Sequence, residues 1–196
     1  DCYQPGSLMK PIVISGIFEQ GLVKPDDVFF CNNGTCEIEG RVLHDTHGGH
    51  GNLTVSEIVA YSSNIGMAKL GMLMGNEKMY RYLKQFNFGE RMGIELPGEI
   101  GGIFRPLKQW SKKYTLISIS IGHEIAVTPL QFVTTFCSIP NGGLLLKPTI
   151  IKSRIDNDSE IKEEFQSLQQ VRRVISSNIA RNIMNPILKK VVTEGT

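Results

Sequence analysis

Apolar residues recur at helical spacing in several separate stretches of the chain. In the first, an apolar run over residues 12–18 follows a Pro-Gly-Ser turn and ends before Gly21. A glycine placed just after the last apolar position is typical of a helix C-terminus, where a left-handed residue closes the helix. The pattern therefore predicts a turn followed by a buried helix within residues 5–20.

Two capping boxes predict where further helices begin. Thr54-Val-Ser-Glu57 places a hydroxyl at the cap and a carboxylate three residues later, and Thr128-Pro-Leu-Gln131 repeats the arrangement with proline at the first helical position. The first box predicts a helix through about Tyr61, a break over residues 62–64, and a second helix from there on. The second box predicts a helix with one apolar face.

Two more helices follow from spacing alone. Apolar residues at three- and four-residue intervals predict a helix over residues 77–86. Ser176 is a candidate cap for a last helix, which carries isoleucines at four-residue intervals between positions 179 and 187. Pro186 lies inside this pattern, and we expect it to kink or split the helix because proline removes a backbone donor.

The remaining segments read as short strands and loops. Residues 25–44 predict a small hairpin that turns at Asn33-Gly34, because both residues tolerate positive φ. That turn would place Cys31 opposite Cys36, which leaves open either a disulfide or two reduced thiols. The spacing does not predict a zinc site. We expect loops at 45–52 and 156–170, loop with a short strand at 88–111, and a strand within 144–151.

The bulk properties describe an ordinary globular domain. The chain has 196 residues, of which 41% are hydrophobic and 20% charged, with a net charge of +2. No basic stripe points to a nucleic-acid partner, and no apolar run approaches the roughly 18 residues that span a bilayer. The chain opens on Asp1 without an initiator methionine, so we interpret it as a piece of a longer protein, with any anchor upstream.

Ser7-x-x-Lys10, at the start of the first predicted helix, is the strongest candidate for chemistry. A serine hydroxyl is a weak nucleophile until a neighbouring base takes its proton. Positions i and i+3 share a helix face, and a buried lysine with a lowered pKa can act as that base. Such a tetrapeptide also arises by chance as a surface serine and lysine, so it does not identify a function alone.

Ser62-Ser63-Asn64 interrupts the second helical region. Serine and asparagine at this break can direct side chains into a cleft, although a simple corner between helices favours the same residues. The combination of Ser-x-x-Lys with a later Ser-x-Asn is more informative, because these are two of the three motifs of penicillin-binding proteins and related β-lactamases.

The sequence resembles the penicillin-binding proteins, most closely their class B, division or elongation type. The Pro-Gly-Ser-x-x-Lys-Pro segment is similar to the family's nucleophile segment, and Tyr61-Ser-Ser-Asn-Ile-Gly66 to its second motif. Further similar segments occur in the family's order between residues 88 and 151. They include residues 93–99, 118–122, 127–131 and 141–143.

The resemblance implies an α+β fold, here the mostly helical portion of a serine β-lactamase/transpeptidase-like domain that lacks most of the central antiparallel sheet. It implies a peptidoglycan D,D-transpeptidase that cross-links stem peptides ending in D-Ala-D-Ala and is acylated by β-lactams. Ser7 would be the nucleophile, Lys10 its base, Ser62 a proton relay, and Asn64 would hold Lys10 and the substrate. No metal or organic cofactor is implied.

The chain departs from the family pattern in two places. The third motif, Lys-Thr-Gly, is absent, and the end at Glu194-Gly-Thr196 resembles a segment that precedes it. We therefore expect residues 1–196 to be a transpeptidase domain truncated at both ends and inactive as such. His123-Glu124 stands where the family has a residue and then glycine.

Several alternatives remain open on the sequence. A β-lactam-sensing receptor domain, a class D-like β-lactamase and an inactive scaffold would share the first motif. The resemblance further implies a membrane anchor in the full-length protein, a catalytic domain outside the cytoplasm, and division or elongation proteins as partners. His44, His47 and His50 at three-residue spacing form a weak candidate for metal binding, for which a glycine-rich loop is the simpler interpretation.

Overall fold

The first helix is the centre of the molecule. The computed structural model describes residues 1–46, 48–155, 161–164 and 170–195. A 3₁₀ turn, η1 (Gly6–Met9), leads into α1 (Lys10–Glu19), and every residue of α1 but the last is buried. Gly21 follows with a φ of 62°. The predicted turn, buried helix and glycine stop are confirmed.

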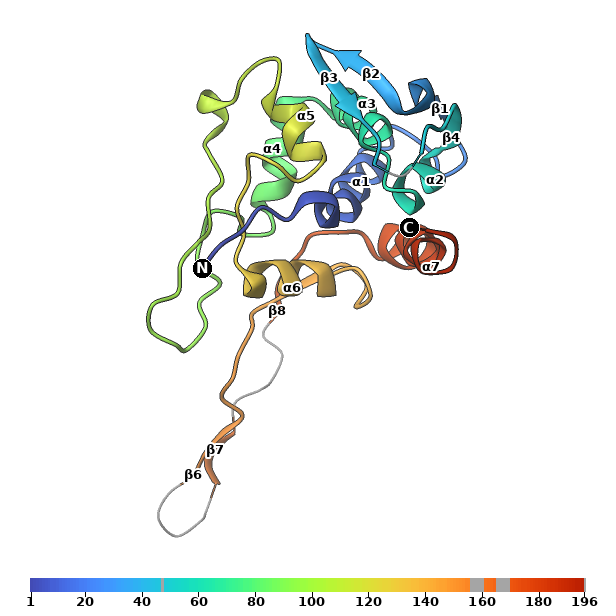
Figure 1. The fold of residues 1–196 in the computed structure, drawn as a ribbon. Helices are drawn as coiled ribbons and strands as arrows, with labels where there is room; N and C mark the ends of the chain where they lie inside the picture. The colour runs from blue at the N-terminus through green and yellow to red at the C-terminus, as the bar shows by residue number, and fades with distance from the viewer. Residues whose placement is uncertain (47, 156–160, 165–169, 196) are drawn as a thin grey trace.

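Helices from the rest of the chain surround α1 (Figure 1). Among the described elements, α2, α3 and α4 pack against it, as does a π-helical turn, η4, near the C-terminus. The other helices are α5, α6 and α7. The bounds are α2 (Val55–Ala60), α3 (Asn64–Met74), α4 (Asn76–Lys84), α5 (Thr115–Ser120), α6 (Pro129–Cys137), η4 (Ile179–Met184) and α7 (Asn185–Glu194), with a short 3₁₀ turn at Leu107–Gln109.

A glycine brings α1 and α4 into close contact. A Cβ on Gly16 would lie 2.4 Å from the ring of Tyr82, so a larger residue would push the two helices apart. Next to it, the hydroxyls of Ser15 and Tyr82 are 2.7 Å apart in the core. Complete burial raises the pKa of Tyr82 far above its ordinary value, because the phenolate would lose its hydration.

The described strands form four separate antiparallel pairs: β1 (Val28–Phe30) with β4 (Asn52–Thr54), β2 (Thr35–Ile38) with β3 (Arg41–His44), β5 (Leu144–Leu146) with β8 (Gln170–Arg173), and β6 (Ser153–Ile155) with β7 (Ile161–Glu164). The β6–β7 pair projects away from the helices (Figure 1). A mostly helical α+β fold with small sheets confirms the expected fold class.

The hairpin prediction is correct in kind but wrong in position. Asn33 and Gly34 lie in a 3₁₀ turn before β2, and the hairpin turns instead at Glu39 and Gly40, with φ values of 54° and 78°. Two consecutive positive φ values give the turn type whose twist matches a hairpin. Cys31 and Cys36 therefore do not lie opposite each other on paired strands, and both are free thiols.

Three further segments differ from the predictions. Most of the loop predicted at 156–170 lies outside the described residues, but residues 161–164 form strand β7. Helix α5 was not predicted. Pro186 does not break the last helical region, because the backbone stays helical through Met184 and Asn185; the hydrogen bonding instead changes from π-helical in η4 to α-helical in α7, which carries Pro186 in its first turn.

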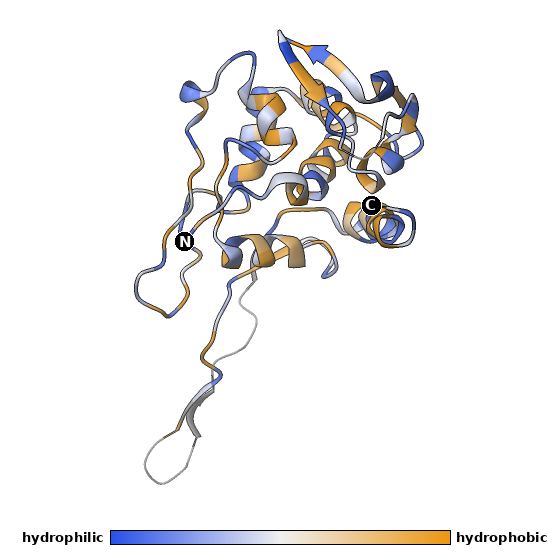
Figure 2. Cartoon of the chain, viewed as in Figure 1, coloured by the Kyte–Doolittle hydropathy of each residue, from blue (hydrophilic) through white to orange (hydrophobic). Residues whose placement is uncertain are grey.

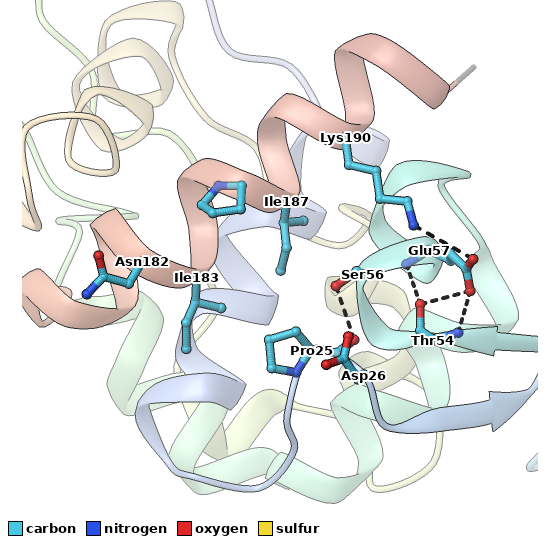
Figure 3. Close-up of a pocket in the computed structure, with 10 residues that line it drawn as sticks. Pro25, Asp26, Thr54, Ser56, Glu57, Asn182, Ile183, Ile187 and Lys190 are labelled. Carbon is cyan, nitrogen blue, oxygen red and sulfur yellow. Dashed lines mark hydrogen bonds and ion pairs between the residues drawn. The ribbon is translucent and has the colours of Figure 1, made fainter.

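Both predicted capping boxes are present, and the first one also faces α7 (Figure 3). Thr54 Oγ1 accepts from the Glu57 amide at 3.2 Å, and Glu57 Oε2 accepts from the Thr54 amide at 2.9 Å. The Thr54 backbone N–H holds the pKa of Glu57 below its usual range. Lys190 on α7 approaches the other Glu57 oxygen at 3.7 Å. Beside this ion pair lies a cavity of about 400 Å³.

The capping box predicts a measurable loss of stability when its hydroxyl is removed. We expect Thr54→Ala to lower the free energy of unfolding by about 1 kcal/mol, because the Glu57 amide loses its acceptor. Urea denaturation would measure the change. Thr193→Ala is the matched control, since Thr193 is exposed near the end of α7. Equal effects of the two substitutions would contradict the capping role.

Candidate active site

Backbone hydrogen bonds to the segment after α5 hold the turn that carries Ser7 in place. Tyr3 and Val127 exchange two backbone hydrogen bonds of 3.0 and 2.9 Å, and the Gly6 amide donates to the Gly122 carbonyl at 3.1 Å. A Cβ on Gly122 would lie 1.9 Å from the Gly6 oxygen, so the two backbones meet without room for a side chain. Ser7 itself is exposed.

Lys10 is a buried cation with a full set of acceptors. Its relative exposure is 1%. Its Nζ donates to the Ser62 carbonyl, to Ser62 Oγ at 2.9 Å and to Asn64 Oδ1 at 2.9 Å. Burial lowers the pKa of Lys10 from 10.5 to about 8, and the nearby Asp45 carboxylate opposes part of this shift. A lysine with this pKa is partly neutral at moderately alkaline pH and can then accept a proton.

The acceptors of Lys10 come from the corner between α2 and α3, residues 62–64. Ser62 has a φ of 55°, in the left-handed region that serine seldom adopts. Ser63 Oγ caps α3 by accepting from the Gly66 amide at 2.9 Å. Asn64 Nδ2 donates to the His44 carbonyl at 2.8 Å, so its oxygen is left to face Lys10. The strained turn thus presents a carbonyl, a hydroxyl and an amide to one ammonium group.

Asp45 holds this corner and was missed as a functional residue from the sequence. Its Oδ1 accepts from the amides of Asn64 at 2.6 Å and Ile65 at 3.1 Å, and its Oδ2 accepts from Ser63 Oγ at 2.8 Å. The sequence placed Asp45 in a loop, next to histidines. No periodicity or spacing links it to a motif that follows 17 positions later, so only the fold reveals the contact.

Three of the predicted site residues line one cavity. It has a volume of about 320 Å³, and its walls include Ser7, Lys10 and Ser62, together with apolar side chains of α6 and α7. Asn64 joins the group through its bond to Lys10. Within the described part of the chain, Lys10 makes no hydrogen bond to Ser7, since its three hydrogens point to the 62–64 corner. A neighbouring hollow of about 340 Å³, which shares Leu8 and Phe136, is apolar throughout.

The other candidate residues do not form a second site. In the ranges that the structure describes, no three side chains of histidine, cysteine, aspartate or glutamate are grouped to hold a metal ion. His44 Nδ1 contacts Thr35 Oγ1 at 3.2 Å and His50 stacks on Tyr61, while His47 lies outside the described residues. No described helix is long and apolar enough to cross a membrane.

The two residues that depart from the family pattern lie beside the turn that carries Ser7. The His123 ring contacts Gln4 Oε1 at 2.8 Å. Glu124 has a φ of 57°, a conformation that a glycine adopts without strain. Its carboxylate accepts from the Thr115 hydroxyl at 2.8 Å, which holds the residue in this conformation.

Comparison with known families now decides the relationship. The model of the penicillin binding protein transpeptidase domain matches residues 1–196. The chain belongs to the penicillin-binding protein transpeptidase family. Stage V sporulation protein D of Bacillus subtilis is 35% identical over 195 residues, and penicillin-binding protein PbpB of Mycobacterium tuberculosis is 32% identical over 194 residues. These relatives confirm the resemblance to class B enzymes.

The fold agrees with solved members of the family. Penicillin-binding protein 3 of Mycobacterium tuberculosis, complexed with aztreonam, superposes with a TM-score of 0.88 at 32% identity, over 99% of this chain and 42% of that one. The transpeptidase domain of Burkholderia pseudomallei penicillin-binding protein 3 gives 0.86 at 28% identity, over 99% and 55%. The match to the Bacillus relative includes 99% of this chain but 30% of that protein, and the match to PbpB includes 93% of this chain but 28% of that protein. The chain therefore spans about a third or less of the length of these relatives.

The close approach of Gly122 to Gly6 generates a test of the turn that carries Ser7. We expect Gly122→Ala to lower the free energy of unfolding by well over about 1 kcal/mol, because strain at positive φ adds to a clash with backbone. Gly98→Ala is the control, since Gly98 has the same φ of 80° and nothing within 4 Å of its Cβ position. The geometry described here would be wrong if both variants unfolded at the same denaturant concentration.

Proposed function

We propose that this chain forms the catalytic part of a peptidoglycan D,D-transpeptidase, with Ser7 as nucleophile and Lys10 as its base. The observation that carries the proposal is the buried Lys10, which has a lowered pKa, lies one turn after Ser7 and binds Ser62 and Asn64. A surface serine and lysine that match the motif by chance would not share a cavity with the second motif.

The first step would be acylation of Ser7. Neutral Lys10 has two hydrogens on Nζ instead of three, so it gives up its hydrogen bond to one acceptor in the corner. The lone pair on Lys10 Nζ is then available to accept a proton. Ser7 Oγ attacks the carbonyl of the penultimate D-Ala as its proton passes to Lys10. The tetrahedral intermediate then collapses and releases the terminal D-Ala, whose nitrogen takes up a proton.

Ser62 is suited to carry that proton. Its hydroxyl both contacts Lys10 Nζ and lines the cavity, so it can receive a proton from Lys10 and donate one to the leaving amine. Asn64 keeps Lys10 in place through Oδ1. An amine on the stem peptide of a neighbouring peptidoglycan strand would then attack the acyl-enzyme, form the cross-link and free Ser7.

The names of relatives support this substrate class. Peptidoglycan D,D-transpeptidase FtsI of Buchnera aphidicola is 27% identical over 195 residues. The Mycobacterium tuberculosis neighbour has been solved with ampicillin as well as aztreonam. We infer that β-lactams acylate Ser7 as mimics of D-Ala-D-Ala. A membrane anchor, a position outside the cytoplasm and partners in division or elongation belong to the same proposal for the full-length protein.

Covalent labelling tests the nucleophile. In the full-length protein, we expect Ser7→Ala to abolish labelling by a fluorescent penicillin, because the substitution removes the hydroxyl that is proposed to form the acyl-enzyme. Ser177→Ala, at an exposed serine far along the chain, is the control and should be labelled fully. Persistent label on Ser7→Ala would require another nucleophile. Rapid loss of label from the wild type would favour a β-lactamase.

The pKa of Lys10 predicts how acylation responds to pH. If neutral Lys10 is the base, the rate constant for acylation should rise about tenfold per pH unit below its pKa and level off above about 8. Stopped-flow fluorescence with a penicillin would record the profile. Lys10→Arg should not be acylated measurably at any pH, because a guanidinium stays charged. A wild-type rate that does not change with pH would exclude this role.

A further inference from the structure

Asp45 is a charged residue next to the site with no part in the steps above. It follows β3, and its two carboxylate oxygens accept three hydrogen bonds, from the Ser63 hydroxyl and from the amides of Asn64 and Ile65. The preceding carbonyl, of His44, accepts from Asn64 Nδ2. The last residue of β3 and the one that follows it therefore bind the side chain and the backbone of Asn64, the residue that faces Lys10.

The position of Asp45 also has an electrostatic consequence. Asn64 and Ile65 are the first residues of α3, an eleven-residue helix whose N-terminus carries partial positive charge. Lys10 contacts Asn64, so its ammonium lies against the positive end of that helix. A carboxylate bound to the first two amides cancels this charge where the cation would otherwise be repelled.

Two other ionisable side chains, Cys31 and Lys69, lie near Asp45. Burial raises the pKa of the Cys31 thiol, which Asp45, Ser63, Lys69 and Cys36 also influence, so the thiol is neutral. Lys69 is occupied by the Phe30 carbonyl and Asn32 Oδ1, both at 2.6 Å. Asp45 is the charged side chain in the described part of the chain that acts on Lys10.

We propose that Asp45 is a positioning residue, which holds the 62–64 corner against Lys10 and balances the positive end of α3 with its charge. The inference rests on the proposed function, since it concerns the base of that reaction. Two separable effects follow. The hydrogen bonds fix the acceptors of Lys10, while the negative charge favours the ammonium form and so opposes the effect of burial.

Two substitutions in the full-length protein separate these effects. Asp45→Asn keeps an oxygen for the two amides and removes the charge, so the protein should be acylated by a fluorescent penicillin with its pH–rate midpoint moved down by about one unit. Asp45→Ala removes the hydrogen bonds as well, and acylation should slow by about 100-fold, the scale of a displaced catalytic group. Asp26→Asn, at an exposed carboxylate, should leave rate and midpoint unchanged.

The outcomes distinguish this inference from the proposed function. A midpoint in Asp45→Asn equal to that of the wild type would overturn the role of the charge. Wild-type rates in Asp45→Ala would overturn positioning, and circular dichroism would show whether that variant is folded; if it is not, Asp45→Asn alone decides. Failure of the wild type to acylate at Ser7 would remove the proposed function and this inference together.

Discussion

The rest of the site depends on the hydrogen bonds that the buried ammonium of Lys10 makes. A charge excluded from water is costly unless hydrogen bonds replace its hydration, and all three acceptors come from residues distant in sequence, at Ser62 and Asn64. The start of α1 and the start of α3 must therefore meet for the fold to tolerate this lysine. The same requirement that satisfies Lys10 also brings Ser62 to the cavity that Ser7 lines.

Packing around α1 makes that meeting rigid. Gly16 admits the ring of Tyr82, and Gly122 admits the backbone of Gly6, so two close approaches bracket the turn and helix that carry Ser7 and Lys10. On the third side, α7 contributes Leu188 to the cavity of the site, while the preceding residue, Ile187, lines the separate cavity beside α2. A single helix thus borders two cavities, and any movement of it would alter both.

The sequence predicted what local chemistry determines. Capping boxes at Thr54 and Thr128 placed two helices, since their hydrogen bonds join residues three positions apart. The family motifs placed Ser7, Lys10, Ser62 and Asn64, and the structure brings the last three into direct contact. Asp45 could not be found this way, because its partners are set by how β3 returns to α3. The hairpin turn was misplaced because Asn33-Gly34 suits more than one kind of turn, and α5 lacks a side-chain cap that would have marked it.

The left-handed backbone of Ser62 lowers the stability of the fold, while its side chain supplies a hydroxyl to Lys10. A side chain at this φ costs about 1–3 kcal/mol relative to a relaxed conformation, and only glycine would remove the cost. Glycine, however, has no hydroxyl to face Lys10. Substitution by glycine would therefore relax the backbone and at the same time remove the hydroxyl that lies 2.9 Å from Lys10 Nζ.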